Sequence, residues 1–97
     1  MISHLAIVEF SEECNPEQID DLVARIRALR TTIPNVRSLE AGVASTPDGG
    51  RLHRLALVAT FDSVEDLTTY SSHPKHLEVS ALVKELGQSV SGADIFT

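Results

Sequence analysis

The segment Leu55-Ala-Leu-Val-Ala-Thr-Phe61 decides the fold, because it is apolar on both faces of the strand that it predicts. Successive side chains of a strand point to opposite faces, so Leu55 and Leu57 lie on one face while Ala56 and Val58 lie on the other. A run of aliphatic and β-branched residues is typical of a strand in the middle of a sheet. The segment therefore predicts a central strand with an apolar layer on each side.

Composition and capping residues indicate a strand and a helix in the first third of the chain. His4–Phe10 is mostly apolar and rich in Ile, Val and Phe, which predicts another strand with two apolar faces. A helix follows, because Asn15 is a good N-cap, Pro16 suits the first helical position and Gln18 completes a capping box. Ile33 precedes a proline and so ends this helix. The helix carries one apolar stripe at helical spacing, made of Ile19, Leu22, Val23, Ile26 and Leu29.

The central strand is predicted to belong to a hairpin. Val36–Ser45 has the character of a strand, and Thr46–Gly50 is rich in turn-forming residues. Arg54–Phe61, which contains the opening segment, then returns beside the first strand of the hairpin.

The last third of the chain predicts a broken helix and a final strand. Ser63-x-x-Asp66 resembles a capping box and opens a short helix. His73-Pro74 interrupts that helix and starts another, for which Gly87 supplies the C-terminal cap. Val90–Phe96 is the last strand.

The order of elements is β-α-β-β-α-β, with the second helix in two parts, in a single domain of residues 1–97. This order is typical of the α+β ferredoxin-like fold, whose antiparallel sheet has strands one and three in the centre. The helices of so short a chain cover only one face of four strands. The other face, with Leu5, Ile7, Ala56 and Val58, is left against water, which usually marks an interface.

We therefore expect a homodimer in which two sheets pack through these faces about a two-fold axis. Burying one medium-sized aliphatic side chain stabilises an assembly by about 1.5–3 kcal/mol. The alternative is a monomer with a few exposed aliphatic side chains.

Charge and cysteine content exclude several classes of function. Eight Lys and Arg against fourteen Asp and Glu give a net charge of −6, which argues against a nucleic-acid partner or an anionic membrane surface. No apolar run approaches the length of a membrane span, and no secretory signal is visible. Cys14 is the only cysteine, so an internal disulfide or a thiolate metal cluster is excluded. The expected location is the cytoplasm.

His76 is the first candidate for acid–base chemistry. If Pro74 is the first helical residue, His76 lies in the first turn, where the helix dipole and the charge of Lys75 both disfavour imidazolium. A neutral imidazole accepts a proton, which is what a general base must do.

Tyr70 and His4 complete the candidate group. Tyr70 is the only tyrosine and lies on the apolar face of the preceding short helix, and its hydroxyl suits a hydrogen bond to a substrate carbonyl. His4 shares its strand face with Ala6 and Val8. A cavity on that face would gather His4, Tyr70 and His76.

Each of these residues also has an ordinary structural interpretation. A tyrosine at helical spacing is usually part of the core, His73 before a proline suits a helix cap, and His4 can simply start a strand. His73-x-x-His76 has the spacing of metal ligands, but no acidic residue or cysteine nearby completes a site, so no metal is expected. Gly49-Gly50 lacks the other members of a phosphate-binding loop, so no cofactor is expected.

The chain resembles the stress-responsive A/B barrel (Dabb) family over nearly its whole length. The resemblance is most specific from Phe61 through His76, and it implies a dimeric α/β barrel of ferredoxin-like subunits. The segments that carry it, in order, are His4–Phe10, Leu29–Pro34, Leu55–Phe61, Tyr70–His76 and Asp94–Phe96.

The resemblance also implies candidate roles. A plant member of the family is a polyketide cyclase that closes a ring by an intramolecular aldol condensation without a cofactor. By this resemblance His76 is the base that removes an α-proton and Tyr70 is the donor to the enolate or carbonyl. His4 and His73 are then substrate-binding residues. Small residues such as Ala6 distinguish this chain from that enzyme in the expected pocket.

Three functions remain open from the sequence. The first is binding of a small apolar or aromatic ligand between sheet and helices, with cyclisation as its catalytic form; it predicts a mainly apolar cavity of roughly a few hundred Å³. The second is a non-catalytic structural or stress-protective dimer with a filled interior, in which His73 and His76 serve the start of a helix. The third is a cofactor-free monooxygenase of the related barrel type.

Overall fold

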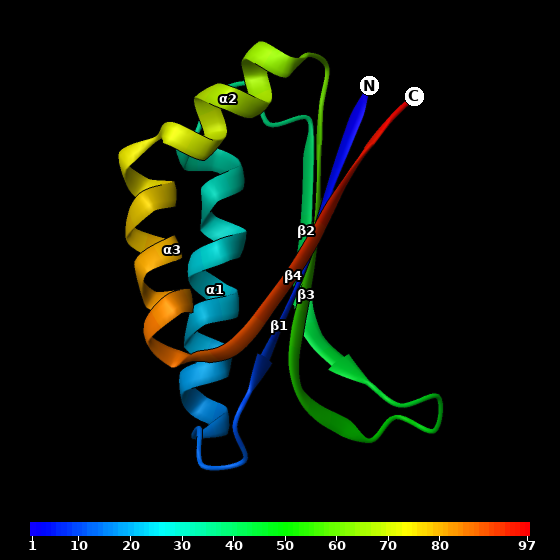
Figure 1. Cartoon of the computed structure of the whole chain (residues 1–97), viewed down its shortest axis with the longest axis vertical. Coiled ribbons are helices and arrows are strands. Elements are labelled where there is room, and N and C mark those ends of the chain that lie inside the picture. The colour runs from blue at the N-terminus through cyan, green and yellow to red at the C-terminus, as the bar shows by residue number, and fades with distance from the viewer.

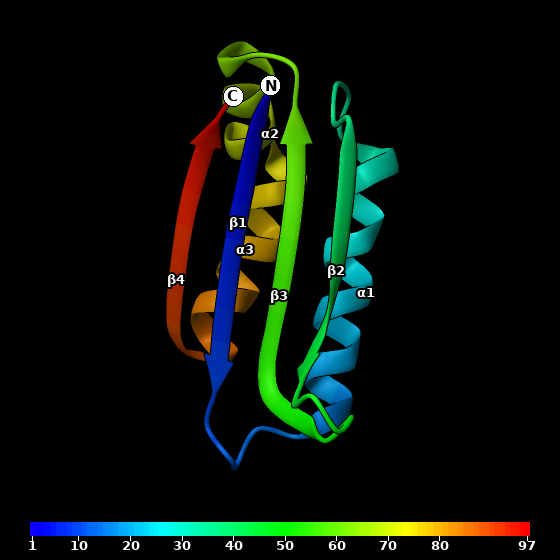
Figure 2. The same cartoon turned by 90° about the vertical axis from the view of Figure 1, so that its right-hand side faces the viewer.

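The computed structural model describes residues 1–97 and has the predicted order of elements. The four strands form one antiparallel sheet in the order β2-β3-β1-β4, so the two most apolar strands are central. All three helices lie on one side of this sheet (Figure 1), and the view onto the other side shows the strands uncovered (Figure 2). The chain thus has the α+β ferredoxin-like fold. Its elements are β1 (Ile2–Phe10), α1 (Pro16–Thr32), β2 (Ser38–Ser45), β3 (Arg51–Phe61), α2 (Val64–Ser72), α3 (Pro74–Leu86) and β4 (Gly87–Phe96).

The strand limits differ from those that the apolar pattern indicates. β3 begins at Arg51 instead of Arg54, because its backbone already pairs with Ser45. β4 begins at Gly87 instead of Val90, directly after α3 and with no loop between them. β1 starts two residues earlier than predicted and β2 two residues later. Backbone pairing sets the limits of a strand, and side-chain patterns do not report where it begins.

The predicted helix caps are confirmed. The Asn15 side chain accepts a hydrogen bond from the Glu17 N–H at 2.8 Å, and the Gln18 side chain accepts one from the Asn15 N–H at 3.2 Å. The Ser63 hydroxyl accepts one from the Asp66 N–H at 3.2 Å, so α2 also begins where its sequence indicates.

Gly87 ends α3 because no other residue fits there. A Cβ at this position would lie 2.6 Å from the Val83 carbonyl oxygen and 3.0 Å from a methyl group of Val8. The Gly87 N–H meanwhile donates to that same carbonyl and closes the last turn. The passage from helix to strand is therefore a tight joint that requires glycine.

The two long helices pack differently on the sheet. The whole apolar stripe of α1 is buried, and it packs against Leu55, Ala59 and Phe61, which have no exposed surface. No residue of α3 is buried: Val79, Leu82, Val83 and Leu86 are half-covered, and Leu77 is exposed. The core is thus dense beneath α1 and less filled beneath α3. None of the helices combines the length and apolar character that crossing a lipid bilayer demands.

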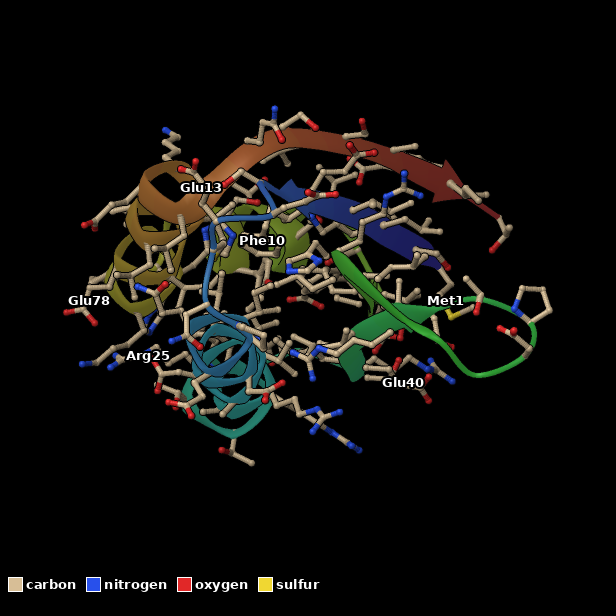
Figure 3. The ribbon with its side chains drawn as sticks, turned by 90° about the horizontal axis from the view of Figure 1, so that it is seen from below. Met1, Phe10, Glu13, Arg25, Glu40 and Glu78 are labelled. Atoms are coloured by element: carbon tan, nitrogen blue, oxygen red, sulfur yellow. The ribbon has the colours of Figure 1, made fainter.

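Charged groups occupy the outer surface of the helical layer. Arg25 on α1 bonds Asp21 at 2.8 Å and faces Glu78 on α3 (Figure 3), and these carboxylates raise the pKa of the Arg25 guanidinium, Asp21 more than Glu78. Ion pairs this exposed add little to stability.

The uncovered face of the sheet is apolar at its centre, as predicted. Ile7 is 47% exposed and Val58 is 40% exposed, although both belong to central strands. Together with Leu5, Ala56 and Ala93 they line a shallow apolar groove, and Leu5 lies directly opposite Val58. We call this surface the open face. Charged residues appear only toward its borders: Glu9 pairs with Arg54 at 3.4 Å, and Glu40 lies on the edge strand β2 (Figure 3).

Candidate functional site

A cavity of about 210 Å³ lies between the sheet and α3, where the core is not filled. Nine of its thirteen lining residues are hydrophobic, so it suits a largely apolar occupant. The cavity extends from the centre of the sheet to its β4 edge. On the sheet side it is lined by Ala6 of β1 and Gly92 of β4, which lie opposite each other in the strand register. Because neither has a side chain beyond Cβ, the space above them stays open.

The structure brings three of the four predicted site residues to this cavity. His4, Tyr70 and His76 all line it, although they come from β1, α2 and α3. The ring centroids of Tyr70 and His76 are 4.6 Å apart, and those of His4 and Tyr70 are 6.3 Å apart. Four other elements separate β1 from α3 in the chain, so only the tertiary fold makes this group.

The Tyr70 side chain is packed in the core, while its hydroxyl stays unbonded. The side chain is only 2% exposed, and its ring packs on Phe61 with a centroid distance of 5.1 Å. The hydroxyl has no hydrogen-bond partner in the chain, yet every fully buried side-chain polar atom is paired. The hydroxyl must therefore open into the cavity. Burial raises the pKa of Tyr70, so the group is a protonated donor at neutral pH.

His76 is oriented as a proton acceptor. Its Nδ1 lies 3.0 Å from the Ser71 carbonyl oxygen, and since a carbonyl only accepts, Nδ1 carries the proton. The other ring nitrogen, Nε2, is then the unprotonated one. Burial lowers the pKa of His76 from its ordinary value of 6.5; the bond to Ser71 opposes this shift, and the nearby His4 adds to it. The imidazole is neutral at neutral pH, as its place in the first turn of α3 predicts.

His4 pairs with an acidic residue that the sequence analysis did not single out. Asp94 lies directly opposite His4 in the register of β1 and β4, and its Oδ1 is 2.6 Å from His4 Nδ1. An ionised carboxylate only accepts hydrogen bonds, so the pair places a proton on Nδ1 of His4. The order of elements in the sequence indicates that the first and last strands are neighbours in the ferredoxin-like fold. It does not indicate the register that places Asp94 opposite His4.

His73 lies outside the cavity lining. Its Nδ1 accepts a hydrogen bond from the Lys75 N–H at 3.1 Å, and the residue is the N-cap of α3. This is the structural interpretation that its place before a proline suggests. The fourth predicted site residue therefore positions α3 and does not line the same space as His76.

The arrangement can move protons in an apolar space. An unprotonated imidazole nitrogen belongs to the same cavity as an unbonded tyrosine hydroxyl, which is the pairing of a general base with a hydrogen-bond donor. No three His, Cys, Asp or Glu side chains are grouped as metal ligands would be.

The fold defines a small ferredoxin-like protein with a cavity between its sheet and its last helix. Residues 2–97 match the sequence pattern of the Stress responsive A/B Barrel Domain. The chain belongs to that family.

Solved structures with the same fold include proteins described as dimeric. One is a dimeric ferredoxin-like protein of unknown function from Thermobifida fusca, with a TM-score of 0.85 at 20% identity over 99% of this chain and 90% of the other. Another is a dimeric protein of ferredoxin-like fold from Bacteroides fragilis, with a TM-score of 0.81 at 22% identity over 99% and 95%.

An enzyme is also among the similar structures. The hydroxynitrile lyase from Passiflora edulis has a TM-score of 0.82 at 20% identity over 99% of this chain and 92% of the other. At such identities the likeness is one of fold alone. Among curated protein sequences, none matches this chain.

Proposed function

We propose that the cavity binds a small apolar carbonyl compound and catalyses proton transfer at the carbon next to the carbonyl, without a cofactor. The observation that carries this proposal is the pairing of the unprotonated Nε2 of His76 with the unbonded hydroxyl of Tyr70 in one apolar cavity. A hydroxyl that opens into an apolar cavity loses its contact with water when a ligand enters, and this is costly unless the ligand supplies a hydrogen-bond partner. A ligand carbonyl supplies the missing partner.

The reaction follows from these two groups. Nε2 of His76 takes a proton from the carbon adjacent to the carbonyl, and the C–H electron pair forms a C=C bond while the C=O π electrons move onto oxygen. The Tyr70 O–H donates a hydrogen bond to the resulting enolate oxygen. The enolate carbon then either regains the proton or attacks a second carbonyl of the same molecule. In the second case a C–C bond forms, and the proton on His76 passes to the new alkoxide.

The remaining polar group of this end of the cavity has a supporting role. His4 lines the cavity, and because its Nδ1 is engaged by Asp94, Nε2 is the ring nitrogen left for the occupant. It therefore suits a hydroxyl group of the ligand. His73 has no part in this proposal, since its ring is engaged at the helix cap.

The size of the cavity narrows the class of occupant. An apolar cavity of about 150 Å³ holds a benzene molecule, and the space here is about 210 Å³. One substituted aromatic ring therefore fits, whereas a long extended chain does not. The hydroxynitrile lyase of Passiflora edulis gives separate support for catalysis, because it is an enzyme with a similar fold.

We infer that the working form is a homodimer joined through the open face. Ile7 and Val58 are exposed at the centre of the sheet, where no helix of the same chain reaches them. Similar folds from Thermobifida fusca and Bacteroides fragilis are described as dimeric. A second copy, related by a two-fold axis, would bring the same apolar groove against itself. The cavity lies on the other side of the sheet, so assembly leaves it accessible.

The catalytic proposal is tested by hydrogen–deuterium exchange at the methyl group of acetophenone in D₂O, followed by NMR. The protein should accelerate the exchange above the buffer rate. His76→Asn retains a side-chain N–H near the Nδ1 position for the bond to Ser71, but it has no base at Nε2, so the acceleration should fall about 100-fold or more. Tyr70→Phe keeps the ring on Phe61 and should cost roughly 100-fold. His53→Asn, a histidine outside the cavity, is the matched control.

A second candidate function is a purely structural dimer, and the cap formed by His73 and the bond from His76 to Ser71 favour it. In that case the native protein gives no exchange above the buffer rate. His76→Ala, which breaks the bond to Ser71, then lowers the midpoint of thermal unfolding as its only effect. Exchange that persists in His76→Asn would remove His76 from the mechanism.

A further inference from the structure

Ser80 on α3 is a polar lining residue of the cavity that the proposed reaction does not use. It is half-buried, and its hydroxyl makes no hydrogen bond in the chain, whereas the hydroxyls of Thr32 and Ser72 both donate to the backbone carbonyl one turn earlier. Apart from Tyr70, whose hydroxyl is described above, the other residues with unbonded hydroxyls in the helices lie on α2 and are exposed, so that water can serve them. Ser80 is therefore the second helical residue, besides Tyr70, that lines the cavity and has a hydroxyl without a partner.

Ser80 and His76 are spaced along α3 so that their side chains reach different parts of the cavity. The two residues are four positions apart on α3, so they share a face of the helix and lie about 6 Å apart along its axis. Opposite them, Ala6 and Gly92 leave the sheet side without a bulky side chain. An occupant can therefore extend from the His76 and Tyr70 end to Ser80 without obstruction.

Because its surroundings are apolar, the Ser80 hydroxyl affects which ligands bind. Val79 and Val83 flank Ser80 on α3 and line the same cavity, together with Val8 and Val90 from the sheet. An apolar ligand placed over Ser80 would take its hydroxyl out of contact with water and give no hydrogen bond in return, which costs free energy. A ligand oxygen at this point avoids that cost.

We propose that Ser80 binds a second oxygen substituent of the ligand and so selects an aryl ketone that is oxygenated para to its carbonyl group. This inference rests on the proposed function, because it takes the carbonyl to lie at His76 and Tyr70. A para-substituted ring places its two oxygen-bearing ends about one helical turn apart, which matches the spacing of His76 and Ser80. The ring itself lies over Ala6 and Gly92.

The test compares the dissociation constants of acetophenone and 4-hydroxyacetophenone for the full chain, measured by NMR titration near neutral pH. The native protein should bind 4-hydroxyacetophenone roughly three- to tenfold more tightly, the value of one neutral hydrogen bond. Ser80→Ala should abolish this preference, because it weakens binding of 4-hydroxyacetophenone and removes the desolvation cost that acetophenone pays over the Ser80 hydroxyl. Thr69→Ala, which removes an exposed hydroxyl of α2, is the matched control and should keep the preference. A third probe, 2′-hydroxyacetophenone, carries its ring hydroxyl ortho to the ketone, and Ser80 should not increase its affinity.

The outcomes separate this inference from the catalytic proposal. If both probes bind with the expected preference but acetophenone exchanges no α-protons, the catalytic proposal fails and the assignment of Ser80 stands. If exchange occurs but the two probes bind equally, or Ser80→Ala retains the preference, the assignment of Ser80 is wrong. Failure of both probes to bind overturns it too, since it requires an aryl ketone in the cavity.

Discussion

The two faces of the sheet are built from the same kinds of residue but have opposite environments. On β3, Leu55 has no exposed surface, whereas Val58, three residues later on the other face, is 40% exposed. Both are aliphatic residues in the same central strand. The difference arises entirely from the helices, which cover one face and not the other (Figure 1). Apolar periodicity thus identifies the faces of a sheet, but the rest of the chain decides which face becomes the core.

The covered face is itself uneven, and this unevenness creates the cavity. Beneath α1 the apolar stripe is buried against β3, while beneath α3 the small residues Ala6 and Gly92 leave space. The open face would be closed by a second copy of the chain, and the space under α3 by a ligand. The same sheet therefore supports two separate binding surfaces, one on each side.

The largest expected difference between the two faces is in stability, and it comes from truncating a side chain on the covered face. Leu55→Ala should lower the free energy of unfolding by about 2–5 kcal/mol at every protein concentration, because it leaves a cavity in the core of one subunit. Val58→Ala should lower stability in a manner that depends on protein concentration, because in the proposed dimer its partners belong to the second subunit. Urea unfolding at several concentrations measures both. A concentration-independent loss for Val58→Ala equal to that of Leu55→Ala would contradict the distinction.

The next effect concerns assembly through the open face. Ile7→Glu places a charge at the centre of the proposed interface and should raise the dissociation constant of the dimer at least roughly 100-fold, because the buried carboxylate has no partner. Sedimentation equilibrium measures the change.

Val64→Glu is the control for this experiment. Val64 is 52% exposed, similar to Ile7, but it lies at the start of α2, away from the open face. Its substitution should leave the dimer intact. A dimer that tolerates Ile7→Glu would place the interface elsewhere.

The smallest expected effect is a pH dependence of stability, which arises from His76 on the covered side of the sheet. The folded state lowers the pKa of His76 below 6.5, so the unfolded chain binds more protons as the pH falls past that value. The contribution of His76 to stability is therefore complete above pH 6.5 and is lost as the pH falls through the lower pKa of the folded state. Thermal unfolding of the native protein and His76→Asn over this range measures the difference, which should be absent in the variant. An identical pH profile for the two proteins would show that burial does not perturb His76.

The architecture could be predicted from the sequence more fully than the site. Asn15 and Gln18 define the start of α1 by themselves, and the two-faced pattern of residues 55–61 indicates a central strand, since both signals are local. Asp94 beside His4 depends on the register between the first and last strands. No single segment contains that register.

His73 and His76 illustrate the same limit from the other side. The two histidines lie in one motif and have similar sequence environments, yet one caps α3 and the other lines the cavity. The bond between His76 and the Ser71 carbonyl fixes the ring orientation, and it depends on the angle at which α2 meets α3. Likewise the cavity exists because Ala6 and Gly92 come to lie opposite each other beneath α3, and this pairing depends on the register of β1 and β4.

The two ends of α3 are fixed by residues outside the cavity. At one end His73 caps the first turn, and at the other the chain passes into β4 through Gly87, where a larger residue would collide with Val83 and Val8. Neither His73 nor Gly87 lines the cavity. The residues that begin and end this helix are thus separate from those that shape the cavity, so ligand preference can be redesigned one lining side chain at a time while both ends of α3 stay as they are.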